Sequence, residues 1–277
     1  MQCFLDEIKN DIITIMTEAD DNGFRKTTSN NDMNTTANNE QHDNTRSPWR
    51  DFAPDCTEYR GPGIPYAKAN NPAPGQWDGR ILSPGRVAGY KPFVAVDGEG
   101  IRCSVYTAFC PFNCDKCFSP LVQKRNVGFP YDDEFENRVI QDLGHSYVQG
   151  LTLLGGEPML NTPMFIKLCK RVRSEYGDTK DIWCWTGYTW EELHRTGETP
   201  DKLELLSYVD ILVDGRFMID FKDPMLQFRG SSNQRVIDVK KSNEAGKVII
   251  WAGSHDQDKA YKEFTATERA LSEGIES

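Results

Sequence analysis

The stretch AFCPFNCDKCFSP, residues 108–120, places Cys110, Cys114 and Cys117 in a C-x3-C-x2-C pattern. A disulfide would use two of these thiols, and a structural zinc site would need four ligands, which usually come as two separated pairs. No second cysteine pair follows. His145 or His194 could supply a fourth zinc ligand, but neither lies at a recognisable ligand spacing from the three cysteines. A [4Fe-4S] cluster held by three thiolates keeps one iron open for a substrate. The odd number of cysteines therefore favours an iron–sulfur cluster whose fourth ligand does not come from the protein.

Strand and helix patterns alternate from about Arg86 onward and must position this loop. Short β-branched and aromatic runs predict strands, whereas apolar residues at helical spacing between Asn, Thr, Pro or Gly predict helices. The expected strands are 101–109, 150–156, 181–187, 209–215 and 246–253, and the expected helices are 131–144, 161–177 and 199–208. This alternation implies right-handed crossovers and a mainly parallel sheet. Because the units are too few for eight strands and eight helices, we expect an α/β fold with a partial, open β/α barrel.

Polar residues and glycines follow the expected strands, where the carboxyl ends of parallel strands meet at one edge of the sheet. Gly155, Gly156 and Glu157 follow the second strand, and paired glycines allow a backbone to approach a ligand closely. Thr186, Gly187 and Asp214 end the next two strands and are either ligand contacts or ordinary strand-end residues. Two further groups are less specific. Asp97, Gly98 and Gly100 form either a turn or an entrance loop, and Arg229, Ser231, Asn233 and Arg235 lie in an irregular segment.

The composition restricts the class of protein. The chain has 277 residues, eight cysteines and a formal net charge of −10. Nucleic acids and anionic membranes attract clustered cations, and the chain has no long apolar run, so we expect neither partner. The N-terminus lacks the pattern of a secretory signal, which predicts a cytoplasmic protein whose thiols stay reduced. Cys103, Cys169 and Cys184 then fit small core residues, while Cys3 and Cys56 receive no role.

The first part of the chain differs from the rest. Residues 22–47 contain almost no aliphatic side chains and cannot bury enough apolar area to offset their chain entropy. We therefore expect a largely disordered N-terminal extension over residues 1–70, a folded domain over 71–255 and a C-terminal tail over 256–277.

The cysteine pattern, on a loop after a strand, resembles the signature of the radical S-adenosylmethionine superfamily. The segments VDGEGIRCSVYTAFC, GLTLLGGEPMLN, DIWCWTGYTWEEL, DILVDGRF and QFRGSSNQRVIDV resemble the glycyl-radical-enzyme activases. Among these, the chain is similar to the anaerobic ribonucleoside-triphosphate reductase-activating proteins over residues 71–251. Lys116 departs from the superfamily pattern, because many members have an aromatic residue just before the third cysteine.

The resemblance implies a mechanism and a set of partners. Cys110, Cys114 and Cys117 would hold a [4Fe-4S] cluster, and S-adenosylmethionine would chelate the open iron and be cleaved to methionine and a 5'-deoxyadenosyl radical. That radical would take a hydrogen atom from a glycine of the reductase, with the electron supplied by reduced flavodoxin or ferredoxin. Gly155, Gly156 and Glu157 would bind the amino group of the cofactor, with Thr186, Gly187 and Asp214 nearby. Two alternatives remain open: a short radical S-adenosylmethionine enzyme for a small heterocycle, and a zinc-stabilised binding module.

Overall fold

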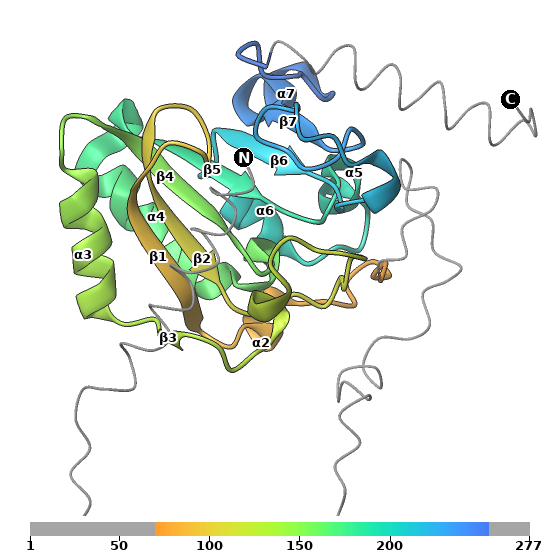
Figure 1. Cartoon of the computed structure of the whole chain (residues 1–277), viewed down its shortest axis with the longest axis horizontal. Coiled ribbons are helices and arrows are strands. Elements are labelled where there is room, and N and C mark those ends of the chain that lie inside the picture. The colour runs from red at the N-terminus through yellow and green to blue at the C-terminus, as the bar shows by residue number, and fades with distance from the viewer. Residues whose placement is uncertain (1–69, 255–277) are drawn as a thin grey trace, which may run out of the picture. The chain divides into compact units, whose positions relative to one another are not determined.

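The computed structural model describes residues 70–254 and contains one seven-stranded sheet (Figure 1). The strand order is β3-β1-β2-β4-β5-β6-β7, and the two edge strands do not pair with each other, so the sheet is not closed. The strands are β1 (Arg86–Val94), β2 (Ile101–Thr107), β3 (Phe129–Pro130), β4 (Val148–Gly155), β5 (Asp181–Trp185), β6 (Ile211–Asp214) and β7 (Arg235–Asp238). The mixed α/β class is confirmed. The predicted extension, apart from Asn70, and the predicted tail lie outside the described residues, as do Cys3 and Cys56.

The centre of the sheet is parallel and sets the position of the site. β2 pairs with β4, β4 with β5 and β5 with β6, all in parallel. The register pairs Thr107 with Gly155 and Trp185 with Val213, so these strands end at the same edge. The cysteine loop, which follows β2, therefore starts beside the residues that follow β4, β5 and β6.

The outer strands are antiparallel, and they are the part that the sequence pattern did not predict. β1 pairs with β2 and β3, and β7 pairs with β6. The strand expected at 246–253 was wrong, because that segment forms only one isolated bridge, between Ile237 and Ile250. Its start is held against the preceding helix by the bond from Ile249 N–H to Ser242 Oγ, and it turns again after Trp251. A single bridge is all that fits between these two turns.

The two long helices follow their sequence signals. α3 (Asp133–Leu143) begins after Asp132, whose side chain accepts a bond from Phe135 N–H at 2.8 Å, and it ends at Gly144. α4 (Thr162–Tyr176) has Pro163 in its first turn and ends at Gly177, whose φ of 55° suits a glycine. The other α-helices within residues 70–254 are α2 (Gly79–Leu82), α5 (Trp190–His194), α6 (Pro200–Leu206) and α7 (Val239–Ala245). Short 3-10 turns are η2 (Pro120–Gln123), η3 (Pro158–Leu160), η4 (Gly177–Thr179) and η5 (Ile219–Phe221).

The core combines helix and strand residues, including the three cysteines assigned to it. Cys103, Cys169 and Cys184 are buried, which confirms that expectation. Over β5, β6 and β7, Trp183 packs with Ile211, Val213 and Val236, and a set of half-buried aromatic residues covers this cluster: Trp185, Phe228 and Trp251. In residues 70–254, none of the helices has both the length and the apolar composition that a membrane span requires.

Candidate functional site

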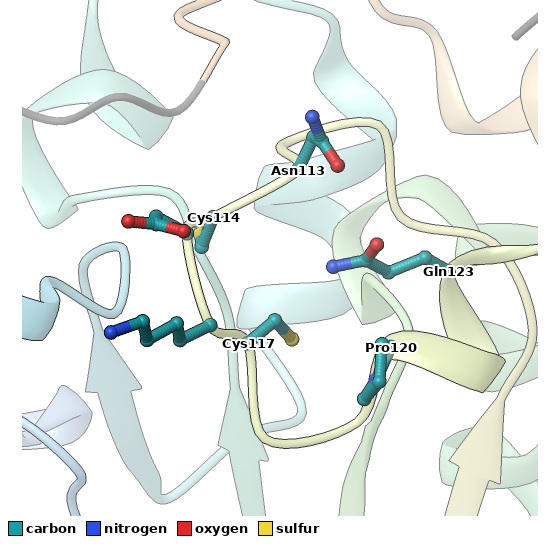
Figure 2. A pocket seen from close by; sticks show the side chains of 7 residues that line it. Asn113, Cys114, Cys117, Pro120 and Gln123 are labelled. Carbon is teal, nitrogen blue, oxygen red and sulfur yellow. The ribbon is translucent and has the colours of Figure 1, made fainter. Parts of the chain in front are cut away.

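The three cysteines of the motif lie on one loop beside a pocket (Figure 2). All three are free and half-buried. Cys114 and Cys117 line a pocket of about 490 Å³, a volume typical of small-molecule sites. The other lining residues are Asn113, Asp115, Lys116, Pro120 and Gln123. Figure 2 shows the side chains of Cys117 and Gln123 pointing into the same hollow. The structure thus places two of the three thiols on a cavity large enough for a bound group.

The loop backbone has an unusual and regular conformation. Each cysteine directly follows a non-glycine residue with positive φ, namely Phe109 at 76°, Asn113 at 52° and Lys116 at 51°. Asparagine tolerates this conformation, whereas the aromatic residue and the lysine do so at a cost. Hydrogen bonds hold the start of the loop, since Phe109 N–H donates to the carbonyl of Val122 at 2.7 Å and Cys110 N–H to that of Gln123 at 3.2 Å. The segment after the motif therefore fixes the first cysteine.

Phe112 anchors the loop in the core. Its side chain is fully buried and packs edge-on against Trp77 at 5.2 Å and Tyr188 at 5.1 Å between ring centroids. Asn70 holds the same turn from outside, because its backbone N–H donates to the Phe112 carbonyl at 2.8 Å and its side chain to the Pro111 carbonyl at 2.7 Å. The stretch between the first two cysteines is thus held by both an apolar socket and backbone bonds.

Gly155 and Gly156 allow the end of β4 to meet the start of the cysteine loop. A Cβ atom at Gly155 would lie 2.8 Å from the nitrogen of Thr107, and one at Gly156 would lie 2.5 Å from the carbonyl oxygen of Phe109. Gly155 also has a φ of 104°, which other residues rarely adopt. These contacts explain both glycines through backbone packing, and contact with a cofactor amino group stays a prediction.

Glu157 brings three of the predicted residues together. Its buried carboxylate accepts bonds from Thr186 Oγ1 at 2.6 Å, from Gly187 N–H at 2.8 Å and from Met159 N–H at 2.9 Å. Burial raises the pKa of Glu157 to about 7, although these donors and the charge of Arg216 act in the opposite direction. The carboxylate therefore links the ends of β4 and β5.

Asp214 lies at the same edge but belongs to a second network. Its buried carboxylate accepts from Trp190 N–H at 2.8 Å and from Arg235 Nε at 3.0 Å, and Arg235 also pairs with Glu191 at 2.7 Å. Burial raises the pKa of Asp214 while Arg235 opposes that shift. Asp214 is thus placed near the strand ends, but its oxygen atoms have partners other than Glu157, Thr186 and Gly187.

The less specific groups have structural partners. Asp97, Gly98 and Gly100 form the β1–β2 turn, at the opposite end of β2 from the cysteines, which agrees with a turn and not with an entrance to the site. Asn233 donates to the carbonyl of Arg216 at 2.8 Å, and Ser231 accepts from Met218 N–H at 3.2 Å. Both of these residues therefore fix the loop after β6.

The thiols of Cys110 and Cys114 favour their neutral form, which is a poor metal ligand. Burial is the main reason that the pKa of Cys114 is raised to about 11 and that the pKa of Cys110 is raised well above its ordinary value, and nearby thiols and Glu157 add to both shifts. The charge of Arg216 and the backbone N–H of Phe217 oppose the shift at Cys114. Binding to iron would supply the positive charge that stabilises the thiolates.

A single metal ion and a cluster place different demands on the three cysteines. Among residues 70–254, no three His, Cys, Asp or Glu side chains are grouped as ligands of one metal ion. A zinc site needs its ligands around one point, whereas each thiolate of a [4Fe-4S] cluster binds a different iron. His145 stacks on Tyr147 at 5.1 Å and His194 on Trp190 at 4.2 Å, so both histidines have other neighbours.

The sequence pattern missed three residues of the site: Phe112, Gln123 and Arg216. Arg216 follows the DILVDG strand as an isolated cation, and its charge directly after a buried run was the available signal. Phe112 and Gln123 carried no comparable signal, because their roles depend on residues far away in the chain.

Comparison with known proteins identifies the family. Residues 96–237 match the family model of a 4Fe-4S single cluster domain. The chain is 38% identical to the anaerobic ribonucleoside-triphosphate reductase-activating protein of Escherichia coli K12 over 151 residues, which are 53% of this chain and 94% of that protein. The protein of the same name from Pasteurella multocida is 40% identical, over 52% of this chain and 92% of its own length. The one from Enterobacteria phage T4 is 32% identical, over 51% of this chain and 86% of its own length. The chain therefore belongs to the family of anaerobic ribonucleoside-triphosphate reductase-activating proteins and contains a 4Fe-4S single cluster domain.

Proposed function

We propose that this protein activates an anaerobic ribonucleoside-triphosphate reductase by generating a glycyl radical on it. Cys110, Cys114 and Cys117 hold a [4Fe-4S] cluster, and the vacant ligand position at the cluster takes S-adenosylmethionine. The observation that carries the proposal is a loop of three free, half-buried cysteines beside a pocket of about 490 Å³, within a domain that matches a 4Fe-4S family. The names of the related proteins support the reductase as partner.

The chemistry belongs to the bound group, and the protein supplies position. When bound, the reduced cluster supplies one electron for cleaving S-adenosylmethionine to methionine and a 5'-deoxyadenosyl radical, which takes a hydrogen atom from a glycine and leaves as 5'-deoxyadenosine. The protein's cysteines hold the cluster at the edge of the sheet. Gly155 and Gly156 let the backbone after β4 lie against the loop, and this backbone would be available to a cofactor held by the cysteines.

Glu157 is the anionic group that we assign to the cofactor's amino group. Its carboxylate already accepts bonds from Thr186 and Gly187, which fix its orientation at the ends of β4 and β5. An ammonium group nearby would favour the charged form of a carboxylate whose pKa burial raises to about 7. Thr186, Gly187 and Asp214 complete the strand ends along which we place the rest of the cofactor.

A protein substrate suits the structure better than a small heterocycle. The face of β5–β7 that carries Trp183 is filled by aromatic side chains, with Trp183 within 5.0 Å of Trp251 and 5.1 Å of Phe228 between ring centroids. By contrast, several residues on the cysteine loop and just after it are exposed, among them Lys116, Phe118 and Leu121. An accessible rim of this kind favours a partner's backbone loop as substrate.

The remaining assignments follow from this function. We infer that the open seven-stranded sheet is the partial β/α barrel of the radical S-adenosylmethionine type, within a domain spanning residues 71–255. Reduced flavodoxin or ferredoxin supplies the electron, and the protein works in the cytoplasm.

The experiment is anaerobic reconstitution followed by mixing with reductant, S-adenosylmethionine and candidate reductase. We expect a glycyl radical on the reductase by electron paramagnetic resonance. Cys114→Ala should abolish cleavage, whereas Cys103→Ala, a buried cysteine on β2, should retain it. Cleavage without a radical on any reductase would favour a small-molecule enzyme, and a colourless protein that binds zinc would refute both enzyme functions.

A further inference from the structure

Arg216 is a buried cation next to the cysteine loop. It follows β6 and is only 1% exposed. Its guanidinium makes two bonds to the buried carboxylate of Glu192, at 2.7 and 3.1 Å, and one to the carbonyl of Gly187, at 3.0 Å. Such a fork fixes the plane and position of the guanidinium more firmly than a single bond would.

The free face of this guanidinium lies against the cysteine loop. Its central carbon is 4.2 Å from the centroid of the Phe112 ring, a close cation–π contact. Phe112 stands between Cys110 and Cys114 in the chain, and its ring also meets Trp77, Tyr188 and the backbone at Gly187. Arg216 therefore holds a side chain that anchors the stretch between two of the cysteines.

The charge of Arg216 is held next to the cysteine loop. Its guanidinium contacts the ring of Phe112, which stands two residues before Cys114, while Glu192 is bound through the fork. A buried ion pair contributes little to stability in general, because desolvation offsets the attraction between the charges. Stability alone therefore explains neither the presence of the pair at this site nor its orientation.

We propose that Arg216 is a positioning residue for the cluster: fixed by Glu192, it clamps Phe112 and keeps a permanent positive charge next to the loop that carries Cys110 and Cys114. The proposal rests on the proposed function in one respect, namely that these cysteines hold a cluster. Reduction adds a negative charge to a cluster, so a nearby fixed cation raises its reduction potential. The clamp therefore affects both how well the cluster is held and how easily it is reduced.

The test uses two variants of the full chain. Arg216→Lys keeps the charge and loses the fork, and the double variant Glu192→Gln with Arg216→Gln removes both charges without leaving one unpaired. Glutamine at position 192 still suits the capping box with Thr189. Arg102→Lys is the matched control, because Arg102 is also buried, paired with Asp181 and stacked on Trp183, but lies at the far end of β2.

The readouts are iron and sulfide content after reconstitution, the midpoint potential by titration followed with electron paramagnetic resonance, and unfolding of the apoprotein. We expect both Arg216 variants to bind less iron per chain than wild type, and the double variant to have a more negative midpoint potential. Arg216→Lys should keep a midpoint closer to wild type. Arg102→Lys should change apoprotein stability without changing iron content or midpoint.

Three outcomes would contradict the proposal that Arg216 clamps Phe112. These are wild-type iron content and midpoint in the double variant, the same midpoint change in Arg102→Lys, or full iron content in Arg216→Lys. If the double variant does not fold, Arg216→Lys decides the question through iron content, because it leaves Glu192 with a cation. A wild-type protein that binds no cluster would refute the proposed function itself, which separates that failure from failure of the clamp.

Discussion

The contact between Gly187 and Phe112 gives a sharp test of how the cysteine loop is held. An alanine Cβ at position 187 would lie 2.6 Å from Cδ2 and 2.7 Å from Cε2 of the Phe112 ring. Ordinary carbon–carbon contacts are ~3.5–4.0 Å, so the ring would have to retreat by about 1 Å. The backbone itself permits alanine, because Gly187 is not among the residues with positive φ. Gly187→Ala therefore tests packing and not backbone strain.

The ring has little room to retreat. Trp77 and Tyr188 pack against it edge-on, and Arg216 lies over its face. Overpacking of this kind costs about 1–3 kcal/mol of unfolding free energy. Because the ring moves with the loop, we also expect a lower iron content after reconstitution. Urea unfolding of the apoprotein and iron analysis measure the two effects separately.

Gly89→Ala is the matched control, since Gly89 also lacks positive φ and a Cβ there would meet nothing closer than Tyr106 Cβ at 3.9 Å. We expect its unfolding free energy to stay within about 1 kcal/mol of wild type. Combining Gly187→Ala with Phe112→Leu should remove part of the clash, which gives a coupling of about 1 kcal/mol in a double-mutant cycle. If Gly187→Ala were as mild as Gly89→Ala, or additive with Phe112→Leu, the packing argument would be refuted.

Two further predictions concern the same edge of the sheet, and a third concerns the aromatic cluster over β5, β6 and β7. Because burial raises the pKa of Glu157 from 4.5 to about 7, its contribution to apoprotein stability is present below pH 4.5 and lost as the pH rises through 7. Glu157→Gln should thus remove about 3 kcal/mol of pH dependence across that window, measured by urea unfolding at several pH values, and an unchanged slope would contradict it. Arg235→Met should cost about 3–5 kcal/mol because it leaves Asp214 and Glu191 without their cation, whereas a loss below about 1 kcal/mol would show the network to be dispensable. Trp251→Ala should cost about 2–3 kcal/mol through lost packing on Trp183, with Trp251→Phe much milder, and equal losses in thermal unfolding would argue against that contact.

The central alternation of strands and helices was predictable because each element has a local signal. β4 is mostly buried and rich in aliphatic residues, and α3 and α4 have caps, prolines or glycines at their ends. β1 was missed because it contains Gly89 and Pro92 and does not alternate between buried and exposed residues. β7 has only four residues, which is too short for a periodic pattern, and its pairing with β6 spans a long connection.

The candidate site was also predictable only where its residues have a local signal in the sequence. The three cysteines are close in sequence, so their spacing alone indicated a shared ligand. The ends of parallel strands at one edge also follow from topology, which placed Glu157 near Thr186 and Gly187. By contrast, the contact of Phe112 with Arg216 joins residues about a hundred positions apart, and no local pattern encodes it.

The conformation of the cysteine loop shows why these distant contacts are needed. Phe109 and Lys116 adopt positive φ at a cost of about 1–3 kcal/mol each, which a free loop of this sequence would avoid. The conformation persists because several contacts oppose relaxation: bonds from Phe109 and Cys110 to the segment after the motif, and burial of the Phe112 ring. The cysteine spacing therefore supplies the three thiols that we propose as ligands, while β4, β5 and the loop after β6 supply the shape in which they are held. A peptide with the same motif would keep the thiols and lose that shape.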